Sequence, residues 1–178
     1  MKLHLGCGNK IIPGFVNVDI RPLEGVDLVS DISDLHDIKE NSVDLIYISH
    51  VLEHLDRYTI SKSMKRWYIL LKPGGILRIA VPDFTAIAKL YLDGVNLTNF
   101  IGLLYGGQDY EHNFHHYVWD YKNLEADLHQ SGFKNVYRYD WQKTEHHEVD
   151  DYSQSYYPHM DKKYGILLSL NVEAKKCE

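Results

Sequence analysis

The fold is decided by residues 2–9, KLHLGCGN, in which a short apolar run leads directly into a glycine-rich turn. Glycine lets the backbone turn sharply and lets a ligand approach it closely. In doubly wound α/β sheets, ligands bind at the carboxyl ends of the strands. A second run, FVNVDI at 15–20, ends with Asp19 and Ile20, and Asp31 ends a third, DLVSD. Three successive strand ends therefore carry groups suited to binding a nucleoside.

Strand and helix patterns alternate along the rest of the chain. Apolar residues at helical spacing predict helices over 60–71, 84–91 and 97–104, and Asp120 as an N-cap begins another that ends at Gly132. The candidate strands are 2–6, 15–20, 27–31, 43–49, 75–81, 133–140 and 165–172. This alternation predicts an α/β fold with a doubly wound, mostly parallel sheet covered on both faces.

The composition is that of one ordinary globular domain. Of 178 residues, 44% are hydrophobic and 25% charged, and we predict one domain over 1–178. Within it, 94–120 and the patternless 143–164 are expected to be insertions on the substrate side, because long loops are seldom kept without a use. The net charge of −6 argues against nucleic-acid and anionic membrane partners.

The chain also shows no targeting or membrane signal. No apolar run approaches the roughly 18 residues of a membrane span. The opening MKLHLGCG leaves no room for a leader peptide, and Cys7 and Cys177 do not make a disulfide framework. We therefore expect a cytoplasmic protein.

The glycine spacing favours one class of nucleoside cofactor. A dinucleotide site needs G-x-G-x-x-G and then a helix whose N-terminus holds the pyrophosphate. Here Ile11 stands in the place of the third glycine, and Pro13 and Gly14 interrupt the chain before a helix of useful length can form. An adenosyl sulfonium has no phosphate and suits a negatively charged domain. S-adenosylmethionine is therefore favoured over NAD.

The segments LHLGCG, VNVDI, VDLIYISHVLEHL and LLKPGGILRIAVPD together resemble the successive motifs of class I S-adenosylmethionine-dependent methyltransferases, most closely the small type 11 group, over residues 2–83. The resemblance implies a Rossmann-like sheet of seven strands with the last one antiparallel. It also implies a set of cofactor-binding residues: Gly6, Cys7, Gly8, Asn9, Asp19, Ile20, Asp31, Ile32, Ser49 and His50.

Two features depart from the family pattern. His4 stands where the family usually has a carboxylate, two residues before the first glycine, which bears on how the amino group of the cofactor is recognised. The first crossover helix is reduced to almost nothing, so that side of the cofactor is expected to be less enclosed.

Methyl transfer chiefly requires alignment of the reacting atoms, and a general base adds to the rate where the acceptor is a hydroxyl. His50, which leaves a strand at the cofactor edge, and His115 are the candidate catalytic residues. The segment 105–117 is dense in rings, amides and imidazoles, and it is interpreted either as an acceptor pocket or as a solvated loop. The candidate acceptor contacts are Tyr105, Asp109, His112, Asn113, His115 and His116.

The string HVLEH at 50–54 matches the H-x-x-E-H pattern of a class of metallopeptidases. That pattern lies within a helix and needs a third ligand downstream, whereas His50 follows a strand. Glu53 and His54 are instead expected to cap and pin the turn. The run at His146 and His147 is typical of a solvated face. We therefore predict no metal site.

These observations predict methyl transfer from S-adenosylmethionine to a small polar acceptor, which the resemblance suggests is a sugar or a glycan precursor. Two alternatives remain open. One is a non-catalytic module that binds S-adenosylmethionine, which the missing carboxylate would support, and the other is an NAD-dependent oxidoreductase.

Overall fold

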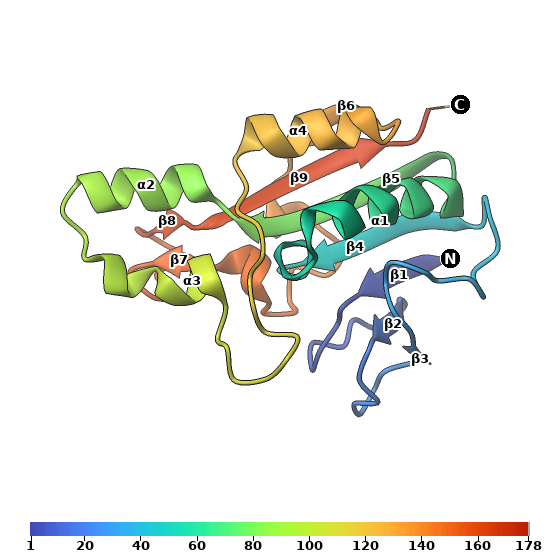
Figure 1. Ribbon diagram of the computed structural model, residues 1–178, viewed down its shortest axis with the longest axis horizontal. Coiled ribbons are helices and arrows are strands. Elements are labelled where there is room, and N and C mark those ends of the chain that lie inside the picture. The colour runs from blue at the N-terminus through green and yellow to red at the C-terminus, as the bar shows by residue number, and fades with distance from the viewer. Residues whose placement is uncertain (178) are drawn as a thin grey trace.

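The computed structural model describes residues 1–177 and contains a mixed sheet of seven strands (Figure 1). The strand order is β3-β2-β1-β4-β5-β9-β6, and β9 runs antiparallel to both of its neighbours. The α/β prediction with an antiparallel last strand is confirmed. The strands span Lys2–Leu5 (β1), Val16–Asp19 (β2), Leu28–Val29 (β3), Val43–Ser49 (β4), Leu71–Pro82 (β5), Lys134–Arg138 (β6) and Ser169–Lys175 (β9).

Helices cover one face of the sheet. Helix α1 (Arg57–Leu70) and helix α4 (Tyr121–Gln130) bury their apolar sides in the main core, while α2 (Phe84–Leu92) and α3 (Ile101–Tyr105) lie toward one end of the molecule (Figure 1). The helix N-caps include Asp56, Asp83 and, as predicted, Asp120, whose side chains accept hydrogen bonds from first-turn N–H groups. Trp67 of α1 is fully buried, and its indole N–H donates to the carbonyl of Ile32 at 2.8 Å.

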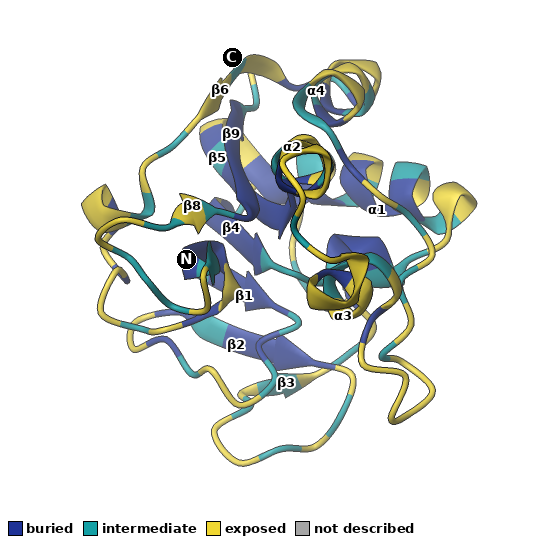
Figure 2. Cartoon of the chain, turned by 90° about the vertical axis from the view of Figure 1, so that its left-hand side faces the viewer, coloured by how far each residue is buried: buried dark blue, intermediate teal, exposed yellow. Residues whose placement is uncertain are grey.

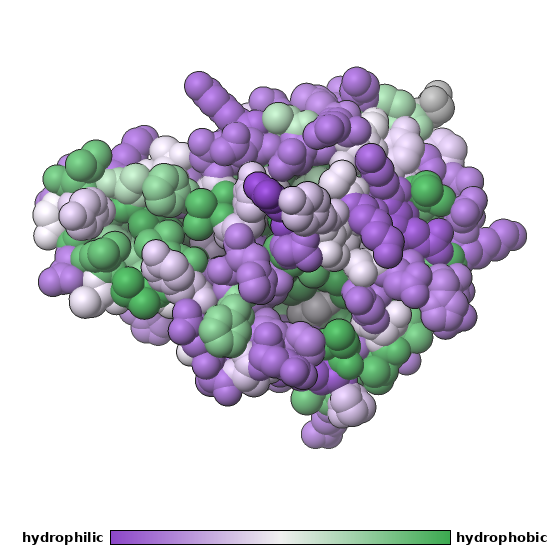
Figure 3. All heavy atoms as spheres, in the orientation of Figure 1, coloured by the Kyte–Doolittle hydropathy of each residue, from purple (hydrophilic) through white to green (hydrophobic). Residues whose placement is uncertain are grey.

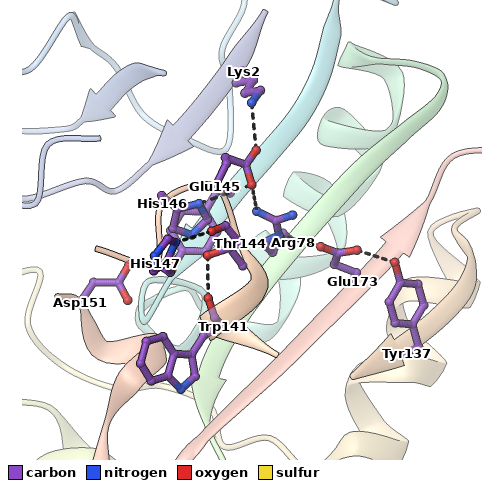
Figure 4. Close-up of polar contacts among 11 residues, drawn as sticks. Lys2, Arg78, Tyr137, Trp141, Thr144, Glu145, His146, His147, Asp151 and Glu173 are labelled. Carbon is purple, nitrogen blue, oxygen red and sulfur yellow. Dashed lines mark hydrogen bonds and ion pairs between the residues drawn. The ribbon is translucent and has the colours of Figure 1, made fainter. Parts of the chain in front are cut away.

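The opposite face is covered by irregular chain instead of helices. The 3₁₀ turns η3 (Trp141–Lys143) and η4 (Tyr152–Gln154) and the residues between them cross this face (Figure 4). Arg78 of β5 donates to Glu145 and to Glu173, each at 2.7 Å, and Lys2 donates to the other oxygen of Glu145. Because buried charges are costly unless paired, this network ties the segment to the sheet.

The first crossover contains no helix, as the sequence indicated. The side chain of Asn17 on β2 instead provides hydrogen bonds to this loop. It accepts from the N–H of Ile12 at 2.9 Å and donates to the carbonyls of Ile12 and Phe15. These bonds satisfy backbone groups of the loop that would otherwise need a helix.

Two predicted elements are divided in the structure. The helix expected over 97–104 divides at the fully buried Phe100 into η2 (Leu97–Asn99) and α3, with Asn96 capping the first turn. The strand expected over 165–172 is also divided, since β8 (Ile166–Leu167) pairs with β7 (Tyr156–Tyr157) and only β9 joins the main sheet. The patternless segment therefore contains a small hairpin strand.

Burial follows this architecture. The central strands are buried, while much of α3 and of the loops beside it is exposed (Figure 2). Apolar side chains gather on the surface over α2 and α3 (Figure 3), among them Phe84, Leu92 and Ile101. Among residues 1–177, no helix combines the length and hydrophobicity needed to cross a membrane.

Candidate active site

A cleft of about 970 Å³ opens at the carboxyl ends of β1, β2 and β4, and we call it the first cleft. The first cleft lies at the edge of the sheet where the sequence predicted a nucleoside site. The first cleft is lined by all ten residues expected to bind the cofactor: Gly6, Cys7, Gly8, Asn9, Asp19, Ile20, Asp31, Ile32, Ser49 and His50.

The glycine turn after β1 has a backbone that other residues rarely adopt. Gly6 has φ +67° and Gly8 has φ +53°. A Cβ atom on Gly6 would lie 2.4 Å from Cγ2 of Val51, so the turn also depends on the absence of a side chain there. Burial raises the pKa of the intervening Cys7 to about 11, which keeps the thiol protonated at neutral pH. Cys7 is thus a small loop residue and not a nucleophile.

Asp19 is buried at the end of β2 and organises the turn. Its Oδ2 accepts from the N–H of Gly8 at 2.8 Å, and its Oδ1 accepts from the N–H and Nε of Arg21 at 2.9 and 3.1 Å. A carboxylate has about four acceptor positions, so one remains for a ligand hydroxyl. The Arg21 guanidinium lies 4.8 Å from the centre of the Tyr110 ring. This contact brings the 105–117 loop against the cleft.

A second cleft of about 660 Å³ lies between α3, the 106–115 loop and residues 151–160. It adjoins the first cleft, and the residues that line both are His50, His54, Asn113, Asp151 and Tyr152. Two ligands of moderate size could therefore meet at these side chains.

The expected acceptor contacts are divided between the clefts. Asn113 lines both and His115 lines the second, whereas Asp109, His112 and His116 line only the first. Tyr105 lines neither cleft and is 55% exposed, because it ends α3 just before Gly106 turns the chain.

Sequence reasoning expected the 143–164 segment on the substrate side but named none of its side chains as part of the site. Asp151 and Tyr152 line both clefts, and Tyr156, Tyr157 and His159 line the second. The only signal for these residues was the length of a loop without periodicity, which marked the segment but could not single out its side chains.

His50 lies where the clefts meet, with a left-handed backbone of φ +52°. Its Nε2 is 3.0 Å from Ser169 Oγ, and its Nδ1 is 3.4 Å from Glu53 Oε1. Burial lowers the pKa of His50 to about 3. A base works best when its pKa is near the working pH, so His50 is suited to hydrogen bonding more than to proton abstraction.

The HVLEH string does not form the helix of the metallopeptidase pattern. Within this string, the only helical residues are Leu52–His54, which form the short 3₁₀ turn η1. The Nδ1 of His54 is hydrogen-bonded to the carbonyl of Phe114 at 3.1 Å, which pins the turn to the 105–117 loop. Within residues 1–177, neither oxygen of the Glu53 side chain has a hydrogen-bond partner, so this side chain caps nothing. The expected capping role of Glu53 is therefore wrong.

Residues 7–79 match the family model of a methyltransferase domain, type 11. Over residues 7–79, less than half of the chain, the sequence is that of a class I, S-adenosylmethionine-dependent methyltransferase domain. The match begins at Cys7, within the glycine turn, and includes Gly8, Asp19 and the strand that leads to His50. No curated protein sequence matches this methyltransferase.

Solved structures share the fold of this methyltransferase at low sequence identity. An S-adenosylmethionine-dependent methyltransferase from Archaeoglobus fulgidus is 18% identical, with a TM-score of 0.59 over 98% of this chain and 85% of its own. The 1,6-didemethyltoxoflavin-N1-methyltransferase of Burkholderia thailandensis is 16% identical, with a TM-score of 0.61 over 99% and 71%. A possible histamine N-methyltransferase from Thermotoga maritima is 16% identical, with a TM-score of 0.60 over 98% and 81%.

The first cleft fits S-adenosylmethionine better than a dinucleotide. Within residues 1–177, no helix follows β1 before β2 begins, so the glycine turn has no helix N-terminus to hold a pyrophosphate. What the turn offers is open backbone at Gly6 and Gly8 beside the Asp19 carboxylate. These groups suit a sugar hydroxyl and a phosphate-free ligand.

Proposed function

We propose that this methyltransferase methylates a small polar acceptor bound in the second cleft while its cofactor lies in the first. The observation that carries the proposal is the junction of the two clefts at His50, Asn113 and Tyr152. Bound S-adenosylmethionine supplies an electrophilic methyl group on a sulfonium. Alignment of an acceptor with that group accounts for roughly 7–11 kcal/mol of barrier lowering in well-oriented systems, so the protein needs no nucleophile of its own.

Asp19 is proposed to accept a hydrogen bond from a ribose hydroxyl through its remaining acceptor position. Ile20 and Ile32, which both line the first cleft, are proposed to pack against the adenine together with the Asp31 backbone. Cys7 and the flanking glycines pass beneath the sugar and the methionine. Asn9 and Ser49 add polar groups to the lining of the same cleft.

Asp151 is proposed to bind the amino group of the cofactor, in place of the carboxylate that β1 lacks. His4 at that position is buried, and burial lowers its pKa, so it is neutral at pH 7 and cannot balance an ammonium. Tyr47 stacks on His4 with 5.2 Å between ring centres and donates to Asp151 Oδ2 at 2.6 Å. Through Tyr47, the Asp151 carboxylate of the 143–164 segment is linked to His4, the position at which the family usually has its own carboxylate.

The second cleft is suited to a hydroxyl-rich acceptor such as a sugar or a glycan precursor. Its lining combines aromatic rings at Tyr156 and Tyr157 with polar groups at Asn99 and His159. Rings and amides of this kind stack on and hydrogen-bond polar ligands. His50 and His115 are proposed to orient the acceptor. The net charge of −6 disfavours a nucleic-acid acceptor.

Calorimetry with S-adenosylhomocysteine tests the cofactor assignment. The wild-type protein is expected to bind it, and Asp19→Ala to bind about 10- to 100-fold more weakly, as expected for loss of a charge-assisted hydrogen bond. The matched control is Asp37→Ala, whose carboxylate is exposed. Equal affinity in all three proteins would contradict the site assignment.

A turnover assay tests the acceptor class. Release of S-adenosylhomocysteine is measured with a panel of sugars, nucleotide sugars, amines and nucleic acids. Turnover with a sugar-containing acceptor is the expected result. Cofactor binding without turnover on any acceptor would instead support the non-catalytic alternative.

A further inference from the structure

Glu53 is a buried carboxyl group without a partner. Its side chain is 0% exposed, and neither carboxylate oxygen accepts a hydrogen bond within residues 1–177. An unpaired buried polar group is rare and costly, and such a group often marks a missing ion or ligand. Its Oε1 faces two imidazoles, with His50 Nδ1 at 3.4 Å and His115 Nε2 at 4.0 Å.

Backbone carbonyls fix the tautomers of two histidines beside Glu53. His54 Nδ1 is 3.1 Å from the carbonyl of Phe114, and His115 Nδ1 is 2.9 Å from the carbonyl of Leu103. A carbonyl oxygen can only accept, so each Nδ1 carries the proton and each Nε2 keeps a lone pair.

His50 has the complementary arrangement. Ser169 Oγ donates to Asn171, so it accepts from His50 Nε2, and the lone pair of His50 is on Nδ1, toward Glu53. Lone pairs from His50 and His115 thus face one buried carboxylate. Acceptors that face each other repel, so the arrangement calls for a proton or a metal ion between them.

The donor atoms of Glu53, His54 and His115 all lie within 4.8 Å of one another. Zinc–ligand bonds of about 2.0–2.1 Å in a tetrahedron separate ligand atoms by about 3.4 Å, so a modest contraction would complete a site. Histidine ligands of metals usually donate their second ring N–H to a carbonyl or carboxylate, which His54 and His115 already do.

We propose that Glu53, His54 and His115 form a binding site for a divalent transition metal of the zinc class. The site uses Glu53 and His54 of the H-x-x-E-H string but not His50, and His115 from the 105–117 loop supplies its third ligand. His54 lines both clefts and His115 lines the second, so two of the three ligands border the clefts, whereas Glu53 lines neither. The metal site is independent of the identity of the acceptor.

Metal titration of the chelator-treated, full-length protein tests the site. We expect one equivalent of Zn²⁺ to bind in calorimetry and one equivalent of Co²⁺ to give the visible absorption of a four- or five-coordinate ion. Glu53→Gln and His115→Asn are each expected to weaken Zn²⁺ affinity by about 100-fold or more, since even a lost second-shell partner costs about 10- to 100-fold. The control His36→Asn alters an exposed imidazole that lines neither cleft and is expected to leave Zn²⁺ affinity unchanged.

The outcomes are separable. Circular dichroism and S-adenosylhomocysteine binding establish that each variant is folded. If the Glu53 variant does not fold, the Zn²⁺ affinity of the His115 variant provides the test of the metal site. Absence of stoichiometric Zn²⁺ and Co²⁺ binding by the wild-type protein would overturn the proposal and leave a proton shared among these groups. Equal binding by the variants would place the metal elsewhere and overturn it as well. Because S-adenosylhomocysteine binding is measured separately, failure of the metal site is distinguishable from failure of the cofactor site.

Discussion

Replacement of Gly6 by alanine is the most direct perturbation of the cofactor cleft. At φ +67°, a residue with a side chain is strained by about 1–2 kcal/mol. The new Cβ would also lie 2.4 and 2.7 Å from the two Cγ atoms of Val51, and such overpacking costs about 1–3 kcal/mol. Together these terms predict a loss of roughly 2–5 kcal/mol, or about 4–20 °C in Tm for a chain of this size.

Gly14→Ala is the matched control for this variant. Gly14 lies in the same loop at φ +81°, but a Cβ there meets nothing within 4 Å. The control therefore carries the strain without the clash, about 1–2 kcal/mol. Thermal unfolding and calorimetry with S-adenosylhomocysteine are compared for both. We expect Gly6→Ala to be the less stable variant and to lose cofactor affinity, and Gly14→Ala to keep it. Equal stability and equal affinity in the two variants would refute the role assigned to the close contact at Val51.

Two further predictions concern the segment that covers the helix-free face. Tyr47→Phe leaves Asp151 Oδ2 without its buried donor and is expected to cost about 1–3 kcal/mol in urea unfolding, whereas the same change at the exposed Tyr58 is expected to cost nothing measurable. Burial and the nearby Arg78 charge lower the pKa of His146 to about 4, so the unfolded chain binds a proton there between about pH 6.5 and 4 and the folded chain does not. Stability from this group is complete above pH 6.5 and falls by up to about 3 kcal/mol as the pH drops toward 4; an equally steep loss in His146→Gln would contradict the assignment.

The fold and the cofactor edge could be predicted because their signals are local. A strand, a glycine turn and a following acidic residue each occupy a few consecutive positions, and the rules of parallel sheets bring the carboxyl ends of β1, β2 and β4 together. All ten expected cofactor residues line one cleft for this reason. The expected acceptor contact of Tyr105 could not be judged in this way, because the exposure of its side chain depends on how α3 ends at Gly106.

The covering of the helix-free face was decided only by the tertiary structure. No periodicity marks residues 141–157, because their burial comes from individual polar pairs with β4, β5 and β9, such as Tyr47 with Asp151 and Arg78 with Glu145. Such pairs leave no pattern in the sequence of either partner.

The sequence by itself determined the sheet, its glycine turn and the class of cofactor, since each depends on neighbours along the chain. The second cleft and the convergence of Glu53, His54 and His115 were decided only by the tertiary structure. The physical reason is that the direction of an imidazole lone pair is set by the carbonyl that its other nitrogen meets, here those of Phe114 and Leu103. Those carbonyls come from distant parts of the chain that meet the histidines only in the folded protein.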